Sequence, residues 1–105
     1  MKEKVYIDRI IYYCEKIIKY TSNVSTFDEF VKQDEKIDAV MLNLEQIGET
    51  AKKLSNVTKE KYTDIKWLSI IGLRNMISHE YEGIRLVIIY EIATKSIPDL
   101  LSKLK

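Results

Sequence analysis

Glycine, proline and cysteine are scarce in this chain, which has 105 residues but only three glycines, one proline and one cysteine. An all-β domain needs turn residues about every ten positions, so their scarcity favours helices. The lone Cys14 excludes an internal disulfide, and the sequence has no cluster of cysteine and histidine to hold a structural metal. We therefore expect an all-α protein of a reducing compartment, the cytoplasm.

Long apolar runs are missing as well. The longest, residues 10–14 and 86–90, contain five residues each, whereas a transmembrane helix needs about 20. Near the N-terminus, Asp8 and Arg9 interrupt the apolar residues before the core of a signal peptide can form. The sequence therefore predicts neither a membrane span nor a cleaved leader.

An excess of charge of either sign is the third absence. Seventeen lysines and arginines against sixteen acidic residues give a formal net charge of +1. This balance excludes a strongly charged disordered tail and a surface that is basic all over, as nonspecific nucleic-acid binding requires. Electrostatic recognition must therefore be local. The length suits a single domain, residues 1–105.

Apolar residues recur at helical spacing along most of the chain. The pattern predicts one helix over residues 3–20 and a second, long helix from Thr26 to about Ser55. Thr26 and Glu29 match a capping box, in which a hydroxyl and a carboxylate satisfy the first free amides of a helix. The start of the second helix is therefore marked by its own local signal.

Small and charged residues distinguish this second helix. Gly48 and Ala51 lie inside its apolar stripe, so another helix can approach it closely. Four charged residues flank the stripe on one side: Asp38, Glu45, Glu49 and Lys52. They form either an acidic wall toward a basic group elsewhere or an ordinary solvated face, and the solvated face is the favoured interpretation.

The remaining segments are shorter. Residues 56–63 are polar and predict a loop, and Asp64 suits the N-cap of a third helix over residues 65–81. Residues 84–92 are rich in β-branched side chains, but a lone strand would have no partner, so they predict a fourth helix. Pro98 suits a kink or the first turn of a last short helix. Together these segments predict a four- to five-helix up-and-down bundle.

One segment concentrates side chains that can carry chemistry. Residues 72–81 contain the single histidine and one of three arginines. One arc of this predicted helix is apolar, and the opposite arc comprises Arg74, Asn75, Ser78 and His79. Gly72 lies seven residues before His79 and nearly above it, which leaves bare backbone for a ligand or a second helix.

This set suits cleavage of RNA without a metal ion, in which a ribose 2′-hydroxyl attacks the neighbouring phosphorus. An imidazole with a pKa of about 6.5 transfers protons at cellular pH, so His79 is the candidate general acid or base. A guanidinium offers phosphate oxygens a planar fork of donors, so Arg74 is the candidate for stabilising the transition state. Tyr81 can orient phosphate, stack a base or be modified, and Asn75 and Ser78 are candidate hydrogen-bonding helpers.

A second interpretation of this segment stays open. An arginine followed by a lone histidine occurs by chance in many helices, and composition and spacing alone favour a histidine satisfied at the interface of a helical dimer. Arg74 and His79 are also about 140° apart on an ideal helix, so they do not readily converge on one atom within one chain. A symmetric dimer in which Arg74 of one copy approaches His79 of the other would form a composite cleft.

Residues 74–81, Arg-Asn-Met-Ile-Ser-His-Glu-Tyr, fit the pattern R-x-x-x-x-H-x-Y. The chain thereby resembles the HepT-type toxins of the HEPN superfamily (higher-eukaryote and prokaryote nucleotide-binding). The likeness also includes residues 38–40, 43–52, Trp67 and 71–75, in order and in spacing. It therefore extends over nearly the whole chain.

The resemblance implies a homodimer with a site in the dimer groove that cleaves RNA, tRNA or mRNA, where Arg74 and His79 match the catalytic positions of the family. It also implies a toxin–antitoxin system of type VII, whose antitoxin is a minimal nucleotidyltransferase (MNT). That partner inactivates the toxin by transferring AMP from ATP to the motif tyrosine, here Tyr81. The added phosphate brings charge and bulk to the place where substrate phosphate binds. No cofactor is expected.

Two other functions stay open. The chain could be a non-catalytic helical partner that presents Tyr81 or a bound nucleotide to a nucleotidyltransferase, or it could be a structural dimer. Four basic residues are candidates for guiding RNA: Lys52, Lys53, Lys66 and Arg85. Glu45 and Glu49 are candidates for orienting Arg74 or His79, but the sequence does not place the two helices side by side.

Overall fold

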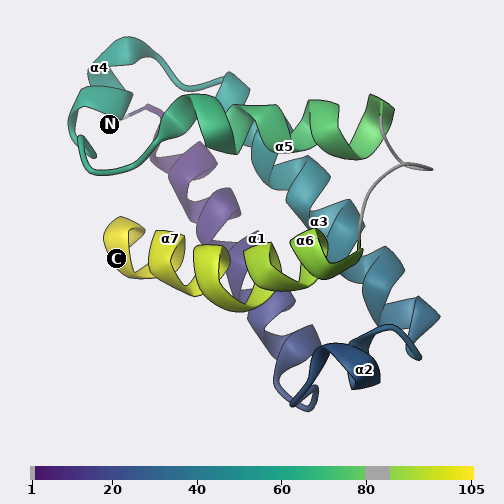
Figure 1. Ribbon diagram of the computed structural model, residues 1–105. Helices are drawn as coiled ribbons and strands as arrows, with labels where there is room; N and C mark the ends of the chain where they lie inside the picture. The colour runs from purple at the N-terminus through teal and green to yellow at the C-terminus, as the bar shows by residue number, and fades with distance from the viewer. Residues whose placement is uncertain (1, 80–85) are drawn as a thin grey trace.

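The computed structural model describes residues 2–79 and 86–105 and, for residues 78 and 79, the backbone alone (Figure 1). Every regular element in these ranges is helical, which confirms the predicted all-α class. The elements in chain order are α1 (Lys4–Thr21), α2 (Phe27–Phe30), α3 (Asp34–Lys52), α4 (Asn56–Glu60), α5 (Trp67–His79), α6 (Leu86–Glu91), a π-helical turn (Ile92–Ser96) and α7 (Ile97–Leu104).

The long helices form two layers (Figure 1). Helix α3 packs against both α1 and α5, and α1 also packs against α7. Helix α6, the π-helical turn and α7 follow one another without a break, and we call this segment, residues 86–104, the C-terminal arm. In Figure 1, α5 and the C-terminal arm cross in front of α1 and α3 and run in opposite directions.

A single apolar core joins these elements. Side chains with no exposed surface come from α1, α2, α3, the C-terminal arm and the turn within it: Ile10, Cys14, Ile17, Phe30, Val40, Leu44, Ile47, Ala51, Ile89 and Ala93. Burial raises the pKa of the Cys14 thiol to about 12, because an apolar environment disfavours the thiolate. Tyr6, Tyr13 and Tyr20 are half-buried and pack against this core, as predicted for its edge.

The predicted second helix is in fact two helices, so that expectation was wrong in its continuity. Its start is confirmed, because the N–H of Glu29 donates to Oγ1 of Thr26 over 3.2 Å. The break comes at Gln33, whose φ of −118° and ψ of 77° are not helical. Phe30 is fully buried, and its ring lies 5.3 Å from that of Tyr90 in the C-terminal arm. This aromatic contact joins α2 to the C-terminal arm.

The polar loop predicted over residues 56–63 contains the short helix α4, which corrects that expectation. Ser55 supplies the missed signal, because its Oγ accepts the N–H of Thr58 over 3.4 Å as an N-cap does. The N–H of Ser55 in turn donates to the Glu3 carboxylate over 2.8 Å. This hydrogen bond lowers the pKa of Glu3 from its ordinary value and ties the start of α1 to α4.

Asp64 is not the N-cap of α5, which begins at Trp67 rather than near residue 65. The first helical hydrogen bond runs from the N–H of Ile70 to the carbonyl of Lys66 over 3.2 Å. The carbonyl of Asp64 instead accepts from Nζ of Lys103 over 3.1 Å, so it belongs to a contact with α7. Helix α5 therefore begins about two residues later than the sequence predicts.

The helix predicted over residues 84–92 is confirmed over its described part as α6. Pro98 lies in the first turn of α7, as predicted, and a π-helical turn precedes it. Proline cannot donate to the carbonyl four residues earlier, and the wider turn accommodates that missing bond. Within the described residues, no helix is long and apolar enough to cross a membrane.

Candidate active site

Helix α5 carries most of the motif and is held from three directions. Its first residue, Trp67, is buried, and its indole N–H donates to the carbonyl of Lys59 over 3.2 Å. Leu73 and Ile77 point into the core. The side of α5 that carries Arg74 lies against α3.

Gly48 sets the distance between α3 and α5. A Cβ added at this position would lie 2.7 Å from the backbone nitrogen of Arg74, 3.0 Å from its Cβ and 3.2 Å from the carbonyl oxygen of Ile70. Real Cβ atoms essentially never approach backbone so closely, so only glycine permits this packing. The sequence predicted a close approach at Gly48, and its partner is the motif arginine itself.

The guanidinium of Arg74 is held on two of its edges. Its Nε lies 2.5 Å from Oε1 of Glu49, on the next residue of α3. Nε is buried and has no hydrogen-bond partner, so within the described residues the ion pair with Glu49 is its polar contact. On the other edge, Nη1 donates to Oδ1 of Asn75 over 3.3 Å. The Arg74 side chain is nevertheless 41% exposed, and that of Glu49 is 37% exposed.

The other predicted site residues are described to different extents. Asn75 is exposed and touches Arg74, so the structure joins these two candidates. Ser78 and His79 form the end of α5, but their side chains lie outside the described residues, as does all of Tyr81. Because Arg74 and His79 belong to one helix, the angular separation expected from helical geometry applies to them.

The two acidic candidates differ in position. Glu49 pairs with Arg74, whereas Glu45, one turn earlier on α3, makes no ion pair or hydrogen bond within the described part of the chain. The favoured interpretation of this flank as a plain solvated face is therefore wrong for Glu49. The sequence alone does not show that α5 packs on this flank of α3, so it could not predict the ion pair.

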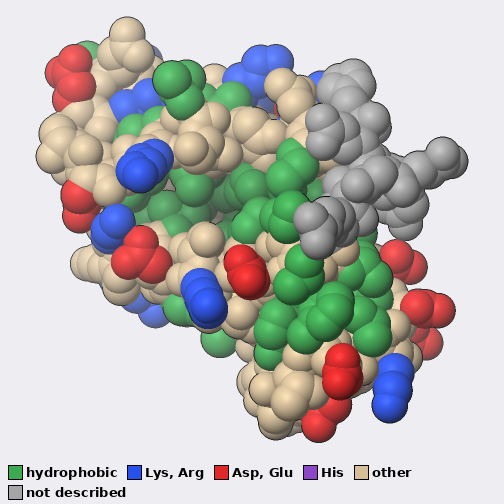
Figure 2. Space-filling view, in the orientation of Figure 1, with side chains coloured by type: hydrophobic (Ala, Val, Ile, Leu, Met, Phe, Trp, Pro, Cys, Tyr) green, Lys and Arg blue, Asp and Glu red, His purple; other side chains and the backbone are tan. Residues whose placement is uncertain are grey.

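The opposite side of α5 borders a groove. A cavity of about 390 Å³ separates α5 from the C-terminal arm, and its lining is mostly apolar: Ser69, Ile70, Gly72, Leu73, Met76, Ile92, Ser96 and Ile97. Figure 2 shows the hydrophobic floor between the two segments. A Cβ added at Gly72 would meet nothing within 4 Å, so bare backbone faces open space there.

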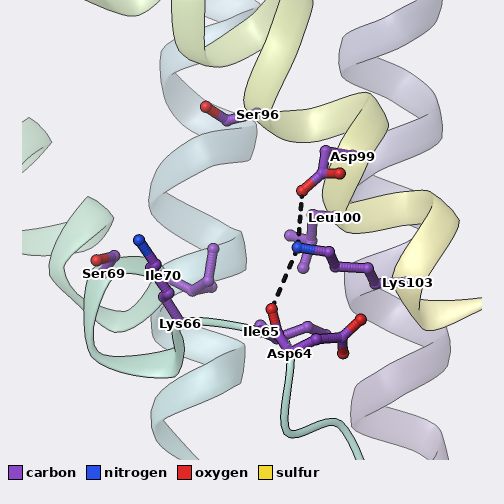
Figure 3. A pocket seen from close by; sticks show the side chains of 9 residues that line it. All are labelled: Asp64, Ile65, Lys66, Ser69, Ile70, Ser96, Asp99, Leu100 and Lys103. Carbon is purple, nitrogen blue, oxygen red and sulfur yellow. Dashed lines mark hydrogen bonds and ion pairs between the residues drawn. The ribbon is translucent and has the colours of Figure 1, made fainter.

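The groove continues into a second cavity of about 330 Å³ near the start of α5 (Figure 3). Ser69, Ile70 and Ser96 line both cavities. Lys103 closes this end, because its Nζ lies 3.1 Å from the Asp99 carboxylate and 3.1 Å from the Asp64 carbonyl oxygen. A lysine of α7 thus ties the C-terminal arm to the segment before α5.

Three of the four basic candidates for an RNA path are described. Lys52 and Lys53 lie exposed at the end of α3, and Lys66 lies exposed directly before α5. Nζ of Lys53 is 5.8 Å from the centre of the Tyr6 ring, a cation–π contact. Arg85 lies outside the described residues. Within those residues, no three side chains of histidine, cysteine, aspartate or glutamate gather as metal ligands.

Comparison with known proteins gives a consistent family. The family model described as "Ribonuclease HepT-like" matches residues 10–105. A protein of Caldanaerobacter subterraneus subsp. tengcongensis named "Putative RNase" is 36% identical over 100 residues, which cover 95% of this chain and 88% of that protein. A protein of Thermococcus cleftensis named "Probable ribonuclease HepT" is 28% identical over 100 residues, 95% of this chain and 90% of its own.

A protein of Methanocaldococcus jannaschii named "Putative RNase" is 32% identical over 97 residues, which cover 92% of this chain and 79% of that protein. No solved structure matches the chain. The likeness to these three proteins therefore rests on sequence and extends over 79–90% of their lengths.

Proposed function

Because this chain belongs to the HepT-like ribonuclease family, we propose that it is a metal-independent endoribonuclease whose site combines Arg74 with His79. The observation that carries the proposal is the setting of Arg74. This arginine is anchored to Glu49 and Asn75, yet 41% of its side chain stays exposed, five residues before the single histidine on the same helix. An arginine fixed and open to solvent suits a phosphate ligand.

Arg74 supplies positive charge where the reaction develops negative charge. When a ribose 2′-hydroxyl attacks the adjacent phosphorus, charge accumulates on the two nonbridging oxygens of the pentacoordinate transition state. The free edge of the guanidinium donates hydrogen bonds to these oxygens more strongly than to the ground-state phosphate. Arg74 therefore lowers the barrier rather than only binding RNA.

His79 acts as the general acid or base. The 2′-oxygen forms a bond to phosphorus as it loses its proton, and the bond from phosphorus to the 5′-oxygen breaks as that oxygen gains a proton. An imidazole performs either transfer at neutral pH, and such help is worth roughly 10²–10⁴ in rate. The products are an RNA with a 2′,3′-cyclic phosphate and an RNA with a free 5′-hydroxyl.

The site requires two copies of the chain. Arg74 and His79 are about 140° apart around α5, so one copy does not aim both at the same phosphate. The apolar groove beside α5 supports a second copy as its occupant, because the groove is lined by Ile70, Met76 and Ile92 and faces solvent at Gly72. In the proposed dimer, a two-fold axis brings Arg74 of one protomer toward His79 of its partner.

The chain is proposed as the toxin of a type VII toxin–antitoxin pair, controlled at Tyr81 by a minimal nucleotidyltransferase. The phenolic oxygen attacks the α-phosphorus of ATP, pyrophosphate leaves, and AMP stays on the tyrosine. The added phosphate is anionic like the RNA backbone, so it competes with RNA for Arg74.

The test is incubation of the purified protein and its His79→Ala variant with total cellular RNA in the presence of EDTA. We expect the wild type to release fragments with cyclic or 2′/3′-phosphate ends, and the variant to cleave at least 10²-fold more slowly. Equal cleavage by both would remove His79 from the mechanism. A folded protein that binds a nucleotidyltransferase but cuts no RNA would instead favour the non-catalytic partner role.

A further inference from the structure

The contact between Glu49 and Arg74 lies at the closest approach of two helices. Gly48 brings the backbone of α3 against the backbone nitrogen of Arg74, and the next residue of α3 carries the carboxylate that meets Nε. From this arrangement we infer that Glu49 is a positioning residue, which fixes the guanidinium of Arg74 so that its free edge meets the RNA phosphate. This inference rests on the proposed function.

The guanidinium has three nitrogen corners, and two of them are occupied. Glu49 takes Nε, and Asn75 accepts from Nη1. Nη2 meets no acceptor within the described part of the chain. The edge between Nη1 and Nη2 can face a phosphate bidentately, because Nη1 carries two N–H groups and can donate to Asn75 and to a phosphate at once. The anchor therefore restricts the arginine without covering its working edge.

Restricting a long side chain before the substrate arrives has a kinetic consequence. An unanchored arginine loses rotamer freedom when it binds phosphate, and it samples orientations in which its donors miss the transition-state oxygens. The carboxylate removes these orientations. Loss of the anchor is thus expected to lower kcat with little effect on KM, because RNA still binds through its other contacts.

A purely structural role for Glu49 fits the geometry less well. Both side chains are more than a third exposed, and ion pairs with that exposure contribute little to stability. The close packing of α3 on α5 comes from Gly48 and from the apolar side chains, not from this pair. Glu49 therefore has little to hold together apart from the arginine.

The chain offers a matched control in Glu45. It lies on α3 one turn before Glu49, is half-buried like it, and makes no ion pair or hydrogen bond within the described residues. Glu45→Gln removes the same unit of negative charge from the same helix. It therefore reports the general effect of charge on RNA binding, free of the effect on Arg74.

The first experiment measures kcat and KM for an oligoribonucleotide that contains a site cut by the wild type. We expect Glu49→Gln to lower kcat roughly tenfold or more with KM within twofold, since small misplacement of a reacting group has effects of this size. Glu45→Gln leaves kcat within about twofold, and Glu49→Asp, which retains the charge, recovers part of the rate. A Glu49→Gln enzyme as fast as the wild type, or faster, would contradict the inference.

Coupling to Arg74 separates positioning from folding. Lysine keeps the charge of Arg74 but has no Nε for the carboxylate to anchor. In an Arg74→Lys background, Glu49→Gln is therefore expected to change kcat by less than about twofold, because residues that act as a unit are not additive. The same tenfold loss in both backgrounds would mean that Glu49 acts elsewhere.

A spectroscopic measurement keeps the inference testable even if the protein cuts no RNA. In protein labelled with ¹⁵N-arginine, the Nε–H signal of Arg74, assigned by its loss in Arg74→Lys, is expected to exchange slowly with water. Glu49→Gln moves this signal to the position and exchange rate of a free arginine, and Glu45→Gln does not. An unchanged signal in Glu49→Gln refutes the anchor, whereas an anchored arginine in a protein without nuclease activity refutes only the proposed function.

Discussion

The two sides of α5 differ in how closely their neighbours approach. On the side of α3, the backbones lie so near that one Cβ added at Gly48 would come within 2.7 Å of the Arg74 nitrogen. On the side of the C-terminal arm, a Cβ added at Gly72 meets nothing within 4 Å, and a groove of about 390 Å³ lies open. The same helix is thus closed on one side and open on the other.

This difference separates two tasks that the proposed site has to combine. The closed side holds Arg74 in place through Glu49, which suits a group whose orientation matters for catalysis. The open side presents apolar side chains and bare backbone to solvent, which suits the arrival of a second protein copy. Variants on the two sides should therefore act on different properties.

The largest effect is expected from a charge placed in the open groove. In the proposed dimer, Met76→Glu buries an unpaired carboxylate, which costs several kcal/mol and weakens self-association roughly 10²-fold or more. Sedimentation equilibrium measures the dissociation constant of the dimer. Leu68→Glu is the matched control, because Leu68 lies on the same helix with 87% of its surface exposed and does not line the groove. Equal self-association of both variants would place the interface elsewhere.

On the closed side, Gly48→Ala is expected to destabilise the fold by about 1–3 kcal/mol, since the new methyl group meets backbone that cannot move aside. Urea denaturation followed by circular dichroism measures the loss. Cys14 provides an independent probe, because its thiol is buried with a pKa of about 12 and reacts only after the core opens. Faster labelling of Cys14 at neutral pH should accompany the loss, and wild-type stability would show that α3 and α5 are not closed at this point.

The corresponding change on the open side has the opposite sign. Gly72→Ala is expected to stabilise the fold by about 0.5–1 kcal/mol. Alanine reduces the conformational entropy of the unfolded chain, and in the folded helix its Cβ meets no neighbouring atom within 4 Å. The free energy of unfolding is measured by urea denaturation in the Met76→Glu background, so that dimer formation does not contribute to it. Destabilisation as large as that of Gly48→Ala would mean that the two sides of α5 are equally closed.

The smallest effect is expected from the ion pair itself. Glu49→Gln should lower the free energy of unfolding by no more than about 1 kcal/mol, because both partners are partly exposed and solvent screens them. Glu45→Gln serves as the reference, and raised salt should narrow the gap between the two variants. A loss of several kcal/mol in Glu49→Gln would turn the pair into a structural element of the closed side.

The sequence predicted the helices in which apolar residues recur at helical spacing and form the core. The stripe that includes Ile10 and Ile17 and the stripe around Leu44 needed only local spacing to be recognised. What it missed depends on contacts between distant residues. Helix α2 ends at Phe30, whose ring packs on Tyr90 of the C-terminal arm. Helix α5 begins only at Trp67, and the Asp64 carbonyl accepts from Lys103.

The candidate site likewise contains residues that local sequence predicts and residues that only a tertiary contact identifies. Arg74 and Asn75 could be named from their neighbours in the motif, since adjacent helical residues share one face or its edge. Glu49 could be named only as one of two acidic candidates, because it lies 25 positions before Arg74 and nothing local selects the partner helix. Gly48 held the missing signal, because a glycine inside a buried stripe marks where another backbone comes close.

The most direct measurement of the composite site is a mixing experiment with two inactive variants. Arg74→Ala and His79→Ala are expected to lose roughly 10²-fold or more of the RNA cleavage when assayed separately. After subunit exchange, a heterodimer holds one site in which intact Arg74 of one copy meets intact His79 of the other, so cleavage should reappear well above the sum of the two. A mixture that has exchanged subunits, shown by two affinity tags, and still cuts no faster than either variant would contradict the account.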